Sequence, residues 1–187
     1  KWSNYGNGKI QGWIINKSTD KYIIDDFTND GKDDILCISN AGWAALFSYN
    51  GSSFYEIWSN GGNNYLEGSS TPANSAYEYL TGDFNDDGKT DILAFTNYWV
   101  TMLDFNTSTN VFNWKWSQWG ANNFASMYIL PLNSTQRMFS GNFDSDDKTE
   151  VLNINNTWSA TADWDGSTFQ QNWNNGGNQN ISDWELN

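Results

Sequence analysis

The chain has 187 residues, 38% of them apolar and 17% aromatic, which is enough material for a buried core and makes disorder a poor interpretation. Its net charge of -13 would repel a phosphate backbone, so nucleic acid is not an expected partner. The absence of histidine excludes Ser-His-Asp and Cys-His catalysis. The lone Cys37 allows no internal disulfide and is expected to be a buried structural thiol. The sequence has no apolar run of about 18 residues, so no membrane span is predicted.

The predicted elements repeat along the chain. An acidic loop starts at Asp26, again at Asp83 and again at Asn142, so that successive loops start 57 and 59 residues apart. Two tryptophan markers keep the same period: one opens a Trp-Ser-Asn-x-Gly-like segment, and the other starts a strand. The first marker is Trp2, Trp58, Trp116 and Trp173, and the second is Trp43, Trp99 and Trp158. Three markers in register indicate an internal repeat of about 57 residues.

Each repeat is expected to contain four antiparallel strands. In the second repeat they are residues 77–84, 90–96, 99–105 and 111–117, which are short, rich in aromatic and β-branched residues and partly alternating. Four strands per repeat is the size of a β-propeller blade, with a solenoid as the alternative. We therefore predict an all-β fold of three β-propeller blades. Because a closed propeller has about four to eight blades, the chain is expected to be part of a longer propeller or to associate with other copies.

The repeat markers divide the chain into predicted segments. Residues 1–20 are expected to be the tail of a preceding blade and a link, and residues 21–60 the first blade. Residues 61–117 hold a link and the second blade, residues 118–174 a link and the third blade, and residues 175–187 part of a next repeat. Because the chain starts at Lys1 rather than Met, we expect a processed mature chain or an excised piece.

The acidic loop has the pattern of a cation site. Oxygen-bearing side chains stand at positions 1, 3, 5 and 9, and a backbone carbonyl at position 7 adds another oxygen, which suits the hard cation Ca²⁺. A glycine at position 6, Gly31 or Gly88, permits a positive φ. An EF-hand is excluded because position 12 is Cys37, Ala94 or Asn153 instead of Glu, and because strands flank the loop. A solvated acidic hairpin without metal is the alternative.

The segment DFNDDGKTDIL, residues 83–93, resembles the FG-GAP repeat of integrin α-subunit propellers and of many secreted bacterial and fungal proteins. The resemblance extends over all three repeats. It implies a propeller with up to three Ca²⁺ ions, one in the hairpin loop between the first two strands of each blade. The implied ligands are side-chain oxygens and, from each lysine, a backbone carbonyl. They are Asp26, Thr28, Asp30, Lys32 and Asp34 in the first loop, Asp83, Asn85, Asp87, Lys89 and Asp91 in the second, and Asn142, Asp144, Asp146, Lys148 and Glu150 in the third.

The third loop departs from this pattern. Asn142 replaces the acid at position 1, Asp147 stands where the other loops have glycine, and Glu150 replaces the shorter acid at position 9. A non-glycine residue at positive φ costs about 1 kcal/mol. We therefore expect the third loop to bind metal more weakly than the other two.

Carbohydrate recognition outside the cell is the function that the resemblance favours, because FG-GAP propellers include lectins. Aromatic rings stack on sugar faces, and asparagine side chains bond their hydroxyls. The expected contacts lie in and near the links between blades. They are Trp58, Asn60, Trp116, Trp119, Trp173 and Asn175. Core packing is the alternative role for the tryptophans, and turn formation is the alternative for the asparagines.

Two other classes of function are a structural or adhesive subunit and an enzyme. A structural or adhesive subunit of a surface or filament, with calcium-stabilised repeats, is the alternative to the lectin. An enzyme is not expected, because the glutamates are scattered and the loops already use most of the aspartates. The expected location is extracellular or at the cell surface, without membrane insertion. Sequons allow glycosylation without predicting it; they stand at Asn16, Asn50, Asn106, Asn133, Asn155 and Asn180.

Overall fold

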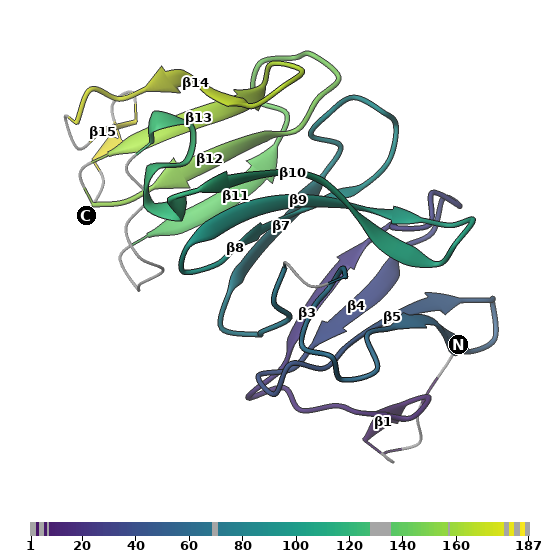
Figure 1. The fold of residues 1–187 in the computed structure, drawn as a ribbon. Coiled ribbons are helices and arrows are strands. Elements are labelled where there is room, and N and C mark those ends of the chain that lie inside the picture. The colour runs from purple at the N-terminus through teal and green to yellow at the C-terminus, as the bar shows by residue number, and fades with distance from the viewer. Residues whose placement is uncertain are drawn as a thin grey trace. The chain divides into compact units, whose positions relative to one another are not determined.

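The computed structural model describes residues 3, 6, 8–68, 71–127, 136–156, 158–177, 180–181 and 184–185. Trp2 and Asn133, which the sequence singled out, lie outside these residues. Strands make up the described elements, apart from the 3-10 segment η1 (Ala121–Ser126), as Figure 1 shows. No helix among the described residues is long and apolar enough to cross a membrane.

Among the described residues, three antiparallel sheets have four strands each, and in each sheet the strands are paired in sequence order. The first sheet contains β3 (Lys21–Asp25), β4 (Asp34–Ile38), β5 (Ala44–Tyr49) and β6 (Phe54–Ser59). The second contains β7 (Glu78–Gly82), β8 (Asp91–Phe95), β9 (Trp99–Asn106) and β10 (Val111–Trp119). The third contains β11 (Arg137–Gly141), β12 (Glu150–Ile154), β13 (Ser159–Trp164) and β14 (Phe169–Asn174). Two short hairpins complete the description: β1 (Lys9–Ile10) with β2 (Trp13–Ile14), and β15 (Asn180–Ile181) with β16 (Trp184–Glu185).

The predicted all-β fold and its four-stranded antiparallel repeats are confirmed. The four strands predicted for the second repeat lie at the observed places, with ends that differ by up to two residues. The two inner strands of each sheet are largely buried on both faces, as in β4, where Leu36, Cys37 and Ile38 are all buried. Burial raises the pKa of the Cys37 thiol to about 12, so this residue is the structural thiol that the sequence predicted. Closure into a propeller remains a prediction.

The chain forms two compact units, each with its own core. Residues 1–77 and 103–114 form the first unit, and residues 78–102 and 115–187 form the second. In the first unit, Phe47 is fully buried and meets Trp13 edge to face, with ring centroids 6.5 Å apart. In the second unit, Phe169 packs among other buried rings, with its ring centroid 5.9 Å from that of Phe84 and 5.0 Å from that of Phe124. Such edge-on and tilted contacts are the usual packing of aromatic cores.

Candidate metal-binding loops and exposed aromatic residues

The three acidic loops connect the first two strands of each sheet, as predicted. The first loop (residues 26–34) joins β3 to β4, the second (residues 83–91) joins β7 to β8, and the third (residues 142–150) joins β11 to β12. The register of each hairpin places the last acid of the loop opposite the residue that ends the preceding strand, as in the pairs Asp25–Asp34 and Gly82–Asp91. This acid is therefore held at the start of an inner strand, where the sheet buries it.

The backbone of the loops explains part of their sequence. Gly31 and Gly88, at position 6, have φ of 81° and 76°, as the sequence predicted. Position 4 also has positive φ, at 55° for Asn29 and 59° for Asp86, and the sequence analysis missed it. Asn and Asp tolerate this conformation better than other residues with a side chain, so their recurrence at position 4 was the available signal.

The third loop takes a different backbone path. Asp147, at the glycine position, is not among the described residues with positive φ, whereas Ser145 at position 4 is, with a φ of 73°. The strain expected at Asp147 is therefore absent. The reason given for weaker metal binding by the third loop does not hold.

In the first loop, backbone amides bind most of the acidic oxygens. Asp26 accepts hydrogen bonds from the amides of Asp30 and Gly31 at 3.0 and 2.7 Å, one on each oxygen. Asp30 accepts hydrogen bonds from the amide and the ammonium of Lys32, at 3.0 and 2.7 Å. Asp34 is fully buried; its Oδ2 accepts a hydrogen bond from the Thr28 amide at 3.0 Å, but its Oδ1 has no partner.

The second loop repeats this arrangement. Asp83 accepts hydrogen bonds from the amides of Asp87 and Gly88 at 3.1 and 2.8 Å. Asp91 is fully buried, and its two oxygens accept from the Phe84 amide and from Nδ2 of Asn85, at 3.2 and 3.3 Å. The Asn85 Oδ1 atom is buried without a hydrogen-bond partner. A backbone hydrogen bond of 2.8 Å, from the Thr149 amide to the Asp83 carbonyl, joins this loop to the third.

The third loop brings three carboxylates together. Asp144, Asp146 and Glu150 each offer one oxygen, and these oxygens lie within 4.8 Å of one another. Glu150 is fully buried; its Oε2 accepts a hydrogen bond from the Phe143 amide, and its Oε1 has no partner. Asn142 uses its side chain within the loop, because its Oδ1 accepts from the Ser145 amide at 2.8 Å. This grouping of acidic ligand atoms is the one found among the described residues.

The buried acid at position 9 has a raised pKa in every loop. Burial, together with the negative charge of Asp87, raises the pKa of Asp91 to about 7. Burial also raises the pKa of Asp34 and of Glu150, with smaller contributions from the neighbouring loop acids. A buried carboxyl surrounded by other acids is costly to ionise, and a bound cation would remove that cost.

The loops fit a hard cation by the chemistry of their unpaired atoms. The Thr28 hydroxyl and the Asn85 Oδ1 atom at position 3, and the Asp34 Oδ1 and Glu150 Oε1 atoms at position 9, are buried without hydrogen-bond partners. Gln136 and Asn153 have unpaired buried atoms too, but their amides offer donors as well as acceptors. The loop atoms are oxygens beside carboxylates, which is the donor set that Ca²⁺ prefers.

Comparison with known families agrees with the loop geometry. Residues 26–94, which include the first two loops, match the model of the FG-GAP-like repeat. The match identifies an FG-GAP-like repeat in this part of the chain. FG-GAP-like repeats are associated with β-propellers and are typically non-catalytic. A search of curated proteins found no match to the chain.

Two of the six expected sugar contacts are partly buried tryptophans that pack against other aromatic rings. Trp58 meets Phe112 edge to face, with ring centroids 4.9 Å apart. Trp116 packs against Trp164 and Phe169, at 5.7 and 5.4 Å between ring centroids. These contacts favour the core-packing role that the sequence left open.

The two expected asparagine contacts are buried and bind backbone. Oδ1 of Asn60 accepts hydrogen bonds from the amides of Ala44 and Gly62, both at 3.0 Å, and its Nδ2 donates to the Gly42 carbonyl at 2.8 Å. Oδ1 of Asn175 accepts from the amides of Ser159 and Gly177, both also at 3.0 Å. This repeated geometry favours turn formation, because each amide holds the end of an outer strand against the strand beside it.

The remaining two expected contacts, Trp119 and Trp173, are exposed. The Trp119 side chain is 64% exposed and stacks on Tyr98, which is 63% exposed; their rings are 5.7 Å apart and inclined by 8°. Trp99 meets Trp119 edge to face at 5.0 Å. Tyr98, Trp99 and Trp119, here called the aromatic cluster, belong to one unit. By alignment of the tryptophan markers, the first repeat has Gly42 and Gly61 where the cluster has Tyr98 and Trp119.

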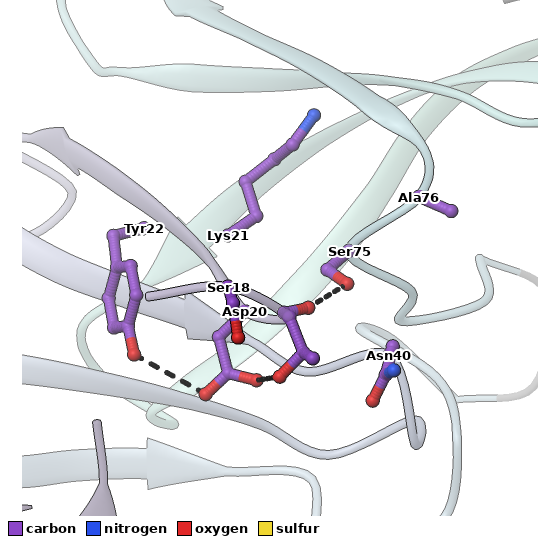
Figure 2. A pocket seen from close by; sticks show the side chains of 8 residues that line it. Ser18, Asp20, Lys21, Tyr22, Asn40, Ser75 and Ala76 are labelled. Atoms are coloured by element: carbon purple, nitrogen blue, oxygen red, sulfur yellow. Dashed lines mark hydrogen bonds between the residues drawn. The ribbon is translucent and has the colours of Figure 1, made fainter. Parts of the chain in front are cut away.

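A polar depression of about 540 Å³ lies in the first unit, between the start of β3, the turn after β4 and the link before β7. Figure 2 shows that its side chains bind one another: the Tyr22 hydroxyl and the Thr19 hydroxyl both donate to Asp20. The Ser75 hydroxyl donates to the Thr19 carbonyl. These contacts fasten the link to the first sheet, so the depression is explained as a junction.

Proposed function

We propose that this chain is a calcium-binding, β-propeller-type recognition module that works outside the cell and binds carbohydrate without catalysing a reaction. The observation that carries the calcium part is the set of buried, unpaired loop oxygens at positions 3 and 9. An unpaired buried polar atom costs about 1–3 kcal/mol, and a bound cation would offset that cost at several atoms at once.

The proposed ligands are those that the repeat pattern implies. The acids at positions 5 and 9 would supply charge, the residue at position 3 would supply a neutral or charged oxygen, and the lysine at position 7 would supply its carbonyl. In the first and second loops, the carboxylate at position 1 accepts two hydrogen bonds from backbone amides of the same loop. These hydrogen bonds hold the loop in a fixed conformation around the other ligands. When bound, Ca²⁺ would neutralise acids that otherwise repel one another and would join the two ends of each hairpin loop.

The aromatic cluster supports the carbohydrate part of the proposal. Two large rings that are both more than 60% exposed gain little from folding, so a ligand is the natural reason for keeping them on the surface. Nearly parallel rings offer a flat apolar face of the kind that packs on the C–H groups of a sugar ring. The charge of -13 favours a neutral sugar over an anionic one.

The test combines metal and glycan binding. The purified chain would be titrated with Ca²⁺ by calorimetry and screened on a glycan array, with Ca²⁺ and with excess chelator. We expect Trp119→Ala to abolish glycan binding, and Trp114→Ala, which removes a 54% exposed tryptophan outside the cluster, to leave it unchanged. Absence of calcium binding would refute the first part, and equal glycan binding by both variants would refute the second.

The alternative is a structural or adhesive subunit. It is supported by the three four-stranded sheets, which are fewer than the about four to eight blades of a closed propeller. A subunit of this kind would associate with other copies, or form part of a longer chain. Sedimentation at several concentrations, with and without Ca²⁺, would detect such association, and failure to bind any glycan in a folded, calcium-loaded sample would favour this function.

A further inference from the structure

We propose that the three loops bind Ca²⁺ with unequal affinity, and that the third loop, the least typical in sequence, binds it most tightly. This inference rests on the proposed calcium binding. It concerns the order in which the loops would fill, and it follows from how far the acids of each loop are already committed to other partners.

The third loop has its carboxylates gathered for a shared ion. One oxygen each from Asp144, Asp146 and Glu150 lies within 4.8 Å of the others. Glu150, one of these three acids, is fully buried, and its Oε1 atom has no hydrogen-bond partner. A site whose ligands are already together requires less rearrangement on binding, which raises affinity for a given set of ligands.

The lysine of the third loop is bound elsewhere. The Lys148 ammonium donates hydrogen bonds to both oxygens of Asp163, at 3.0 and 2.7 Å, and to the Trp164 carbonyl at 3.0 Å. Its ion pair with Asp146 is longer, at 3.2 Å. This lysine therefore anchors the loop to β13 while it also contacts Asp146, and a cation could displace it from Asp146 without breaking its hydrogen bonds to Asp163.

In the first loop, other groups already bind the acids. Both oxygens of Asp26 accept backbone hydrogen bonds, and Asp30 is paired with the Lys32 ammonium at 2.7 Å. Asp34 keeps its unpaired Oδ1, so the loop retains one strong ligand. A cation would have to displace the lysine from Asp30, and this competition lowers the affinity.

The second loop has two lysines near one acid, at longer distances than the single lysine of the first loop. Asp87 lies near two ammonium groups, that of Lys89 at 3.8 Å and that of Lys115 at 3.6 Å. The repeat alignment places Ile57 and Asn172 at the position of Lys115, so this second cation is peculiar to the second repeat. Both oxygens of Asp91 also accept hydrogen bonds. We therefore expect the order of affinity to be third loop, first loop, second loop.

The test is a calorimetric titration of chelator-treated protein with Ca²⁺, using the wild type and one variant for each loop. The variants Asp34→Asn, Asp91→Asn and Glu150→Gln each remove one charge at position 9, and Glu56→Gln removes an exposed charge from β6 as the matched control. We expect the wild type to show a tight step separated by at least about tenfold from the weaker ones. Glu150→Gln should remove the tight step, whereas Asp34→Asn and Asp91→Asn should keep it.

A second pair of variants keeps the test decisive if one of the buried variants does not fold. Asp144→Asn changes an exposed ligand of the third loop and should weaken the tight step even if Glu150→Gln fails to fold. Lys115→Gln should strengthen a weak step by a fewfold. Equal affinities, or loss of the tight step in Asp34→Asn or Asp91→Asn alone, would overturn the inference and leave the proposed calcium binding intact. Absence of calcium binding by the wild type would refute both.

Discussion

The raised pKa of Asp91 predicts how stability depends on pH when calcium is removed. The usual pKa of an aspartate is 3.8, and burial raises that of Asp91 in the folded chain to about 7. The folded state therefore holds a proton between these values that the unfolded state releases, so the contribution of this carboxyl to stability is complete below pH 3.8 and is lost as pH rises through 7. The difference corresponds to a loss of the order of 4 kcal/mol. The raised pKa values of Asp34 and Glu150 act in the same direction.

The assay is urea denaturation of chelator-treated protein at several pH values from about 4.5 to 7.5. We expect the free energy of unfolding to fall across this range, and Asp91→Asn to flatten the slope, because an amide does not titrate. Saturating Ca²⁺ should flatten it as well, since the ion favours the ionised carboxylate. Glu56→Gln is the control and should keep the wild-type slope. A chelated wild type that becomes more stable as pH rises, or an unchanged slope in Asp91→Asn, would refute the reasoning.

Two further predictions concern packing. A Cβ atom on Gly82 would lie 2.5 Å from Cγ2 of Thr149, so Gly82→Ala should destabilise the fold by about 1–3 kcal/mol, whereas Gly12→Ala, with no atom within 4 Å, should not. Thermal melts of the two variants test this, and equal melting temperatures would contradict it. Asn60→Ala should cost about 1–3 kcal/mol by leaving backbone groups unpaired, with little direct effect on glycan binding. A variant with wild-type stability and lost glycan binding would instead make Asn60 a sugar contact.

The sequence predicted the elements that depend on local pattern. Strand positions and the place of each acidic loop followed from the repeat, and the glycine requirement at Gly31 and Gly88 followed from backbone geometry. These features are set by residues close together in the chain. Because the pattern recurs, an assignment made in one repeat was supported by the same pattern in the others. The predicted fold therefore had more support than the prediction of any single strand.

Features that depend on distant residues were not predictable. The anchoring of Lys148 involves Asp163, fifteen residues away, and no spacing rule connects them. The stacking of Tyr98 on Trp119 brings the turn before β9 against the end of β10. No sequence spacing connects these two segments. Asn60 was an expected sugar contact, with turn formation as the alternative; either role uses the same amide, and its burial favours turn formation.

The hydrogen bond from the Thr149 amide to the Asp83 carbonyl has a consequence for how these repeats can diverge. It joins two successive loops through main-chain atoms alone, so it needs no particular side chain at Asp83 or Thr149, although the close approach of Thr149 requires a small residue at Gly82. The composition of one loop can therefore differ from that of the others, as the third loop does at Asn142 and Asp147, without loosening that loop from its neighbour. Drift in ligand identity and conservation of the connection between repeats become separate matters, and a family built in this way can vary its sites while keeping its architecture.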